Sequence, residues 1–175
     1  MSVHICFPRY WRGIFYLGGR MKIGYAYHLK DSFFALVNDP TLMSNKENGG
    51  YRPHYFCLED EKRKGLYWAI PISSKIEKYR AIVNKKIERF GKCNTIVIAS
   101  FAGRESAFLI QNMFPITEEY IDHIHTIAAV PVALHKSTQE VLSQNARSVL
   151  AIYKRNKRII FSDIEGILLA LGFSI

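Results

Sequence analysis

The sequence predicts a protein of the α+β class, built from antiparallel strand pairs and separate helices. Several segments alternate apolar and polar residues, or run apolar between turn residues, which is typical of β-hairpins. Other segments carry apolar residues at the spacing of one helix face. The strands do not alternate with crossover helices, as a parallel βαβ sheet would require. With 175 residues, 49% of them hydrophobic, the chain is long enough to bury a core in one domain.

The first half of the chain is expected to form a strand, a helix and a β-hairpin. The expected elements are a strand over 23–28, a helix that starts at Asp31 and stops at Asn38-Asp39-Pro40, a polar loop over 41–50, and strands over 53–59 and 66–72. The Asp31 carboxylate is predicted to cap the helix. A charged turn joins the last two strands into a hairpin, so residues 52 and 73 should lie close together.

The second half is expected to combine helices with one further strand pair. The expected elements are a helix over 75–90 ended by Gly91, strands over 94–99 and 107–112, a turn into a short helix at 115–118, a long helix over 137–155 and a final helix from Ser162 to Gly172. The helices are predicted from apolar residues at helical spacing and from capping residues at their ends.

The first twenty residues differ from the rest. Three arginines stand among aromatic residues without any acid, and Met21 resembles a second start. We therefore expect residues 1–20 to be an N-terminal extension or a mis-assigned start, and residues 21–175 to form a single domain. The alternative is a basic aromatic arm that stacks on RNA bases.

The composition favours a polyanionic partner. Lys and Arg number 24 against 15 Asp and Glu, which gives a net charge of +9, and nucleic acid is the commonest partner of such proteins. Cys6, Cys57 and Cys93 form no CxxC or Cys/His pattern, so neither a disulfide framework nor a zinc site is expected. No segment has the apolar length of a membrane span. We expect a cytoplasmic protein without metal or cofactor.

The most informative segment is the junction where Ser73, Ser74 and Lys75 follow the strand over 66–72. If a helix begins here, its free backbone N–H groups, two hydroxyls and an ammonium would form a phosphate-binding site. The simpler interpretation is an ordinary helix cap followed by a surface lysine. This segment alone leaves both interpretations open.

The helix predicted after this junction is strongly basic. Between Lys75 and Lys92 there are seven bases and two acids, a net charge of +5. Such a face would contact RNA phosphates without reading the sequence. The RNA-binding candidates are Ser74, Lys78, Arg80, Lys85, Lys86, Arg89 and Lys92. The alternative is a solvated helix face.

The preceding strand supplies two further candidates. Arg52 could clamp a phosphate with its guanidinium fork. The near-neutral pKa of a histidine would suit His54 to acid or base chemistry, although a histidine in an aromatic strand is more often structural. His123 and His125 would need a third ligand to form a metal site, and the sequence does not offer one.

Four ordered motifs carry a resemblance to a known family. They are Arg52-Pro53-His54-Tyr55, Ile70-Pro71-Ile72-Ser73-Ser74-Lys75, Gly91-Lys92-Cys93 and Leu109-Ile110-Gln111-Asn112-Met113-Phe114-Pro115-Ile116. On these motifs the chain resembles the ToxN/AbiQ endoribonuclease toxins of type III toxin–antitoxin systems, and most closely their CptN and TenpN branches. The similarity extends over most of residues 21–175.

The resemblance implies a fold, an activity and partners. The implied fold is a strongly twisted antiparallel sheet flanked by helices, related to the Kid/MazF toxins. The implied activity is metal-independent cleavage of RNA to 2′,3′-cyclic phosphate and 5′-hydroxyl ends. The implied partners are target RNA and a repetitive, pseudoknotted antitoxin RNA, which inhibits the toxin and assembles with it into a ring-like complex.

The family's site residues carry over by position. Its serine falls on Ser73, its lysine on Lys75 and its earlier basic residue on Arg52. We expect Ser73 to position the 2′-hydroxyl and the phosphate, and Lys75 and Arg52 to neutralise the developing charge. His54 or a tyrosine would move protons.

Three positions in or before this motif depart from the family pattern. The threonine before the serine becomes Ile72, and Ser74 stands in place of a proline and could supply the lost hydroxyl. The family's N-terminal tyrosine falls on Phe33, which has no hydroxyl. Its role would then pass to Tyr25 or Tyr27, or be absent.

Two other function classes remain open. A non-catalytic RNA-binding module would need only the basic helix and the aromatic strands, with the Ser73–Lys75 junction gripping phosphate. A serine–lysine hydrolase would use Ser73 or Ser74 with Lys75, but the sequence lacks its Gly-rich oxyanion motif and SxxK spacing.

Overall fold

The computed structural model describes residues 22–47 and 49–175, so the expectations for residues 1–20 lie outside the described residues. The helices and strands are β1 (Ala26–Leu29), α1 (Asp31–Val37), β2 (Lys46–Glu47), β3 (Gly50–Tyr51), β4 (His54–Glu59), β5 (Leu66–Ser73), α2 (Ile76–Phe90), β6 (Val97–Phe101), β7 (Arg104–Phe108), β8 (Phe114–Thr117), β9 (Ile121–Ile124), β10 (Thr126–Ile127), β11 (Val130–Pro131), α3 (Lys136–Tyr153) and α4 (Ile164–Ala170). Short 3₁₀ turns are η1 (Ile110–Asn112), η2 (Glu118–Tyr120) and η3 (Lys157–Ile159).

Strand β5 is central to a seven-stranded antiparallel sheet with the order β6-β7-β5-β4-β1-β9, in which β8 also pairs with β5. On one side β5 pairs with β4. On the other side its first half pairs with β8, and its end, at Ile72 and Ser73, pairs with β7. The last residue of β5 is therefore held by a neighbouring strand.

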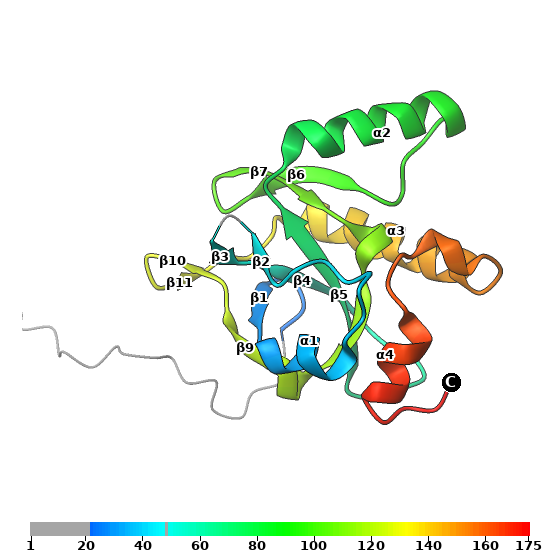
Figure 1. Ribbon diagram of the computed structural model, residues 1–175. Helices are drawn as coiled ribbons and strands as arrows, with labels where there is room; N and C mark the ends of the chain where they lie inside the picture. The colour runs from blue at the N-terminus through cyan, green and yellow to red at the C-terminus, as the bar shows by residue number, and fades with distance from the viewer. Residues whose placement is uncertain (1–21, 48) are drawn as a thin grey trace, which may run out of the picture.

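Both faces of the sheet are covered near its centre, because every residue of β5 and all but the last residue of β4 are buried. Helix α3 packs on β4 and α4 on β8, whereas α2 packs on β7. Figure 1 shows α2 along the β6–β7 hairpin, at the opposite end of the molecule from α1 and α4. This packing fixes where β5 ends and α2 begins.

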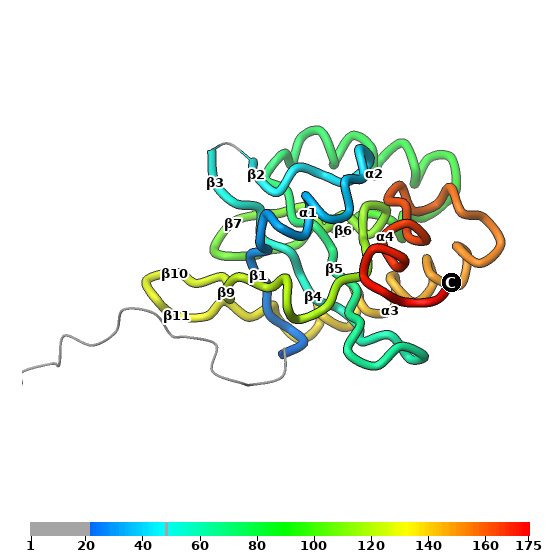
Figure 2. The backbone as a smooth tube through the Cα atoms, turned by 60° about the horizontal axis from the view of Figure 1, so that its bottom comes forward, coloured from blue at the N-terminus to red at the C-terminus, as the bar shows by residue number. Residues whose placement is uncertain are grey.

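The two edges of the sheet approach each other at one place. The ring of Phe101, at the end of β6, lies 5.2 Å from the ring of His125, which follows β9. The hairpins β2–β3, β6–β7 and β10–β11 project on the same side of the molecule in both views (Figure 1 and Figure 2). The end of β5 belongs to this side, because Glu47 of β2 contacts Ser73.

Most predicted elements are confirmed: the α+β class, the β4–β5 hairpin, the four helices and the hairpin now seen as β6–β7. Three expectations are wrong. Residues 115–118 were expected as a turn into a short helix, but Phe114–Thr117 is strand β8, followed by the 3₁₀ turn η2. The strand expected over 107–112 ends at Phe108 and is followed by η1, and the loop expected over 41–50 contains the hairpin β2–β3. Pro115 is compatible with a strand here because β8 pairs only with β5, and an edge strand tolerates a residue without an N–H group.

Candidate active site

The junction between β5 and α2 brings Ser73 and Lys75 together at different depths. Ser73 ends β5 and is only 1% exposed, whereas Lys75 directly precedes α2 and is exposed. The Lys75 backbone N–H donates to Ser73 Oγ at 3.3 Å. Lys75 itself holds the cap position of α2, without a side-chain cap hydrogen bond.

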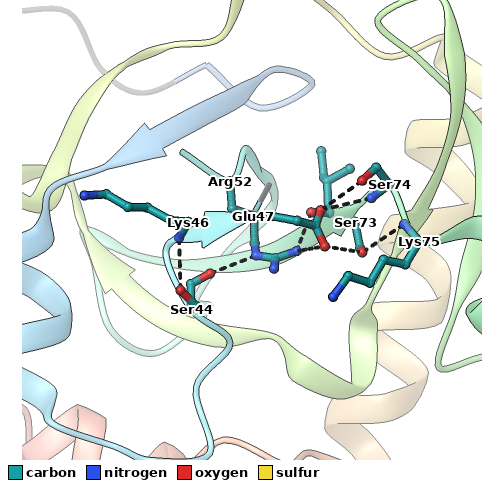
Figure 3. Close-up of polar contacts among 8 residues, drawn as sticks. Ser44, Lys46, Glu47, Arg52, Ser73, Ser74 and Lys75 are labelled. Carbon is teal, nitrogen blue, oxygen red and sulfur yellow. Dashed lines mark hydrogen bonds and ion pairs between the residues drawn. The ribbon is translucent and has the colours of Figure 1, made fainter. Parts of the chain in front are cut away.

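A carboxylate from β2 occupies the anion position that the sequence predicts at this junction (Figure 3). Glu47 Oε1 accepts a hydrogen bond from Ser73 Oγ at 2.8 Å. Glu47 Oε2 accepts from the Ser74 backbone N–H at 3.1 Å and from Ser74 Oγ at 3.3 Å. Backbone N–H and hydroxyl donors of this kind bind carboxylate and phosphate oxygens alike. The protein thus fills its own anion site.

Arg52 supports this group from the interior. Its guanidinium is 5% exposed and donates from Nη1 to the Ile72 carbonyl and from Nε to the Ser44 carbonyl, both at 2.9 Å. Its Nη1 also lies 3.4 Å from Glu47 Oε1. The structure therefore brings Arg52, Ser73 and Lys75 to one place, as the predicted hairpin requires. The Arg52 guanidinium is held by two backbone carbonyls and lies on the buried side of the Glu47 carboxylate.

The β2–β3 hairpin that carries Glu47 is fixed to the start of α1. Asp31 Oδ1 accepts a hydrogen bond from Asn45 Nδ2 at 2.8 Å, and Asp31 Oδ2 accepts from the Tyr51 hydroxyl at 3.0 Å. The prediction that Asp31 caps α1 is wrong, because Lys30 holds the cap position and no side chain caps this helix. Asp31 instead fixes residues on both sides of Glu47.

The electrostatics of the site favour an ionised Glu47. Partial burial raises the pKa of its carboxyl, but the hydrogen bonds from Ser74 and Ser73 and the charge of Arg52 outweigh burial, so the pKa lies below its ordinary value. Tyr79, in the first turns of α2, is close enough to feel Arg52, Glu47 and Ser73, and burial is the main cause that raises the pKa of its phenol. Near neutral pH the site therefore contains the ionised carboxylate of Glu47 and, nearby, the protonated phenol of Tyr79.

His54 lies apart from this group, in the core. It is fully buried and packs against Phe114 and Phe34, with ring centroids 5.5 and 6.2 Å away. Neither ring nitrogen makes a well-formed hydrogen bond to any residue that the structure describes. Burial is the main cause that lowers the pKa of His54 to about 3. The charges of Arg52 and His28 lower this pKa as well, and the Arg52 backbone raises it by a smaller amount. His54 is placed as a neutral core residue.

Replacing His54 with leucine is expected to flatten the dependence of stability on pH. In the unfolded chain an imidazole takes up a proton below about pH 6.5, whereas the folded protein keeps His54 neutral down to about pH 3. The contribution of this group is therefore complete above pH 6.5 and lost as the pH falls through that window, by up to about 1.4 kcal/mol per pH unit. Urea unfolding at several pH values measures it.

Helix α2 presents most of the predicted RNA-binding residues to solvent. Lys78, Lys85 and Arg89 are exposed at helical spacing, so they share one face. The other predicted bases differ in what they contact: Arg80 pairs with Glu105 at 2.8 Å, Lys92 is exposed beyond the helix end, and Lys86 donates to Thr95 Oγ1 and Gln111 Oε1, both at 2.7 Å. Burial lowers the pKa of Lys86. Lys86 therefore anchors α2 to the domain.

Sequence reasoning missed Glu47 and Tyr79. Glu47 was placed in a polar loop, although the Asn48-Gly49 pair that follows it is a hairpin signal and Arg52 stands shortly after it. Tyr79 was assigned only to the apolar face of the helix. No pattern in the sequence links either residue to Ser73, because the link exists only once β2 folds over the end of β5.

Within residues 22–47 and 49–175, no group of three or more His, Cys, Asp or Glu side chains has an arrangement that could hold a metal ion. Within the same ranges, no helix has the length and apolar character to cross a bilayer. His123 and His125 join His28 on β1: His123 stacks on its ring, and His28 Nε2 lies 2.9 Å from His125 Nδ1. Cys57 and Cys93 are free thiols.

Together, the fold and site define an α+β protein whose antiparallel sheet ends in a cluster of hydroxyl, carboxylate, guanidinium and ammonium groups. No protein-family model and no curated protein matches the chain. Among solved structures it is similar to AbiQ, described as a lactococcal anti-phage endoribonuclease belonging to the type-III toxin–antitoxin system. The TM-score is 0.59 at 12% sequence identity, covering 83% of this chain and 93% of that chain. The chain therefore has an AbiQ-like fold, which confirms the resemblance seen in the motifs; the CptN and TenpN branches stay a prediction.

Proposed function

We propose that this protein is an endoribonuclease toxin of a type III toxin–antitoxin system, which cleaves RNA without a metal ion to 2′,3′-cyclic phosphate and 5′-hydroxyl ends. The observation that carries the proposal is the convergence of Ser73, Ser74 and Arg52 on one carboxylate, with Lys75 beside them, within an AbiQ-like fold. Fixed donors that hold a carboxylate suit a phosphodiester and the negative charge that it gains during cleavage.

The role proposed for each site residue depends on how deeply its side chain is buried. Lys75 is the exposed cation and neutralises charge on the reacting phosphate. Ser74, which is half-buried, orients the reacting groups through its hydroxyl, whereas the buried Ser73 holds the Glu47 carboxylate in place. Arg52, being buried, acts by holding the groups around it. The position of His54 in the core does not favour a role for it in proton transfer.

The partners proposed are target RNA and a repetitive, pseudoknotted antitoxin RNA that inhibits the toxin and joins it in a ring-like complex. The AbiQ-like fold and the net charge of +9 support an RNA partner. A role in phage defence within the cytoplasm and membership of the CptN/TenpN branch belong to the same proposal. So does a strongly twisted sheet in a fold related to the Kid/MazF toxins.

Incubation of the purified protein with an A-rich RNA in EDTA tests the proposal. We expect fragments with 2′,3′-cyclic phosphate and 5′-hydroxyl ends, because side chains alone would carry the reaction. RNA that is shifted on a gel but stays intact would instead support the non-catalytic RNA-binding module. Cleavage only after addition of a divalent metal would contradict the metal-independent mechanism.

The adjacent residues Lys85 and Lys86 give a matched test of the basic helix. Replacing the exposed Lys85 with alanine should remove one phosphate contact and reduce the slope of log affinity against log salt by about 0.7, measured with a 2′-O-methyl RNA that cannot be cleaved. Lys86→Ala should leave this slope nearly unchanged but destabilise the fold by about 1–3 kcal/mol, because Gln111 loses its buried donor. Equal slopes in wild type and the Lys85→Ala variant would remove α2 from the RNA interface.

A further inference from the structure

Cleavage of RNA without a metal needs a group that accepts the proton of the 2′-hydroxyl. Around Ser73, the described residues offer few such groups. His54 is buried away from solvent. Tyr79 keeps its proton near neutral pH, since the pKa of its phenol is raised, and Lys75 already has the proposed role of neutralising charge on the reacting phosphate. Glu47 is the carboxylate that remains, and none of the sequence motifs includes it.

We propose that Glu47 is the general base of this site, an inference that rests on the proposed ribonuclease function. Its carboxylate lies over Ser73 and Arg52, and 12% of the Glu47 side chain is exposed. RNA would therefore meet Glu47 and Lys75 before it could reach the buried side chains of Ser73 and Arg52. The 2.8 Å hydrogen bond from Ser73 shows that a hydroxyl finds good geometry at this carboxylate. A 2′-hydroxyl of RNA that reaches the same oxygens would donate a hydrogen bond to them in the same way.

The incoming hydroxyl has a place to bind. Glu47 Oε2 holds the backbone N–H of Ser74 at 3.1 Å and the Ser74 hydroxyl at 3.3 Å. The Ser74 hydroxyl makes the longer of these two contacts, so a 2′-hydroxyl can compete with it for this oxygen of Glu47. The backbone bond would still fix the carboxylate.

In the proposed step the 2′-hydroxyl proton moves to Glu47 while the 2′-oxygen forms a bond to phosphorus. The bond from phosphorus to the 5′-oxygen breaks, and the leaving oxygen takes a proton from solvent. The products are the 2′,3′-cyclic phosphate and a free 5′-hydroxyl, and Glu47 returns its proton to water. Arg52 is then a positioning residue: at 3.4 Å, its charge keeps the carboxylate ionised and in place.

The competing role for Glu47 is a carboxylate that only covers the anion site and must leave before RNA can bind. The two roles predict opposite results for Glu47→Gln, which keeps the size of the side chain and removes its charge. A general base contributes about 10²- to 10⁴-fold to the rate, so cleavage should fall about a hundredfold or more. Affinity for 2′-O-methyl RNA should stay equal or rise, since one negative charge is lost. A mere cover would give faster cleavage in the variant.

The experiment measures single-turnover cleavage of an A-rich RNA by wild type, Glu47→Gln and Glu47→Asp, from pH 8 down to the lowest pH at which the protein stays folded, at or below about pH 3. Glu61→Gln is the matched control, because Glu61 is exposed in the turn between β4 and β5. A base works only when deprotonated, so the wild-type rate should fall as the pH drops through the pKa of Glu47, which lies below the usual carboxyl range. This limb should vanish in Glu47→Gln, and Glu47→Asp should retain more activity than Glu47→Gln.

Two outcomes separate this inference from the proposed function. Cleavage by Glu47→Gln at or above the wild-type rate would overturn the general-base role and leave the ribonuclease intact, whereas a wild type that cleaves no RNA would overturn the ribonuclease itself. Thermal unfolding checks that the variants are folded. If Glu47→Gln does not fold, the wild-type acid limb decides: its presence, with partial activity of Glu47→Asp, supports the base, and a flat profile overturns it.

Discussion

Replacing Lys75 with alanine is expected to lower the rate of RNA cleavage about 10²- to 10³-fold, the effect of removing one fixed donor from a developing oxyanion. The lysine is exposed, and the hydrogen bond that it gives to Ser73 comes from its backbone N–H, which alanine keeps. The substitution therefore removes the ammonium and leaves the junction in place. Single-turnover kinetics at saturating protein separate this loss from weaker RNA binding.

The fold of the Lys75→Ala variant is expected to be unchanged, with a midpoint of thermal unfolding close to that of the wild type. Lys64→Ala is a suitable control because Lys64 is exposed in the turn between β4 and β5. It removes the same charge from another surface and should cleave RNA normally. Full activity in Lys75→Ala would exclude the junction as the active site.

Replacing Phe33 with alanine is expected to destabilise the protein by about 3–5 kcal/mol, the usual cost of truncating a fully buried phenylalanine. Phe33 is 0% exposed in α1, stacks on Phe114 at 5.3 Å between ring centroids, and contacts Tyr120 at 5.5 Å. Its ring links α1 to β8 and η2. Urea unfolding gives the change in the free energy of unfolding.

Phe161→Ala is the matched control, because Phe161 is 51% exposed and its truncation opens no cavity. Its cost should stay within about 0.5 kcal/mol, as for most surface substitutions. The comparison also tests the departure at Phe33 from the family's tyrosine. A stable Phe33→Ala variant that loses cleavage would show that Phe33 acts in the chemistry and not in the core.

Local patterns predicted the elements whose contacts are close in sequence. The β4–β5 hairpin follows from alternating and apolar segments around a charged turn, and it brings Arg52 near Ser73. Helices α2 and α3 follow from apolar residues at helical spacing. Strand β8 could not be predicted in this way. Within the part of the chain that the structure describes, it pairs with the first half of β5, far earlier in the sequence, and that pairing overrides the turn preference of Pro115.

The residues of the site likewise fall into those that local sequence predicts and those that only the folded structure identifies. Ser73, Ser74 and Lys75 were candidates because hydroxyls and a lysine follow a buried strand directly, which is a local feature. Glu47 was not, because its role depends on a short hairpin folding across the end of β5. His54 is the opposite case: its near-neutral ordinary pKa made it a candidate for proton transfer, and only the packed core shows that burial lowers its pKa to about 3.

The sequence by itself determined the α+β class, the central hairpin, the basic helix and the junction at which Ser73 and Lys75 stand, because each depends on neighbouring residues and on the period of a strand or helix. The tertiary structure alone decided that Arg52 is buried, that His54 is in the core and that Glu47 fills the anion position. These facts depend on which distant segments cover one another, and burial and long-range contacts set the charge state and reach of a side chain. Local sequence patterns do not determine which distant segments pack against one another.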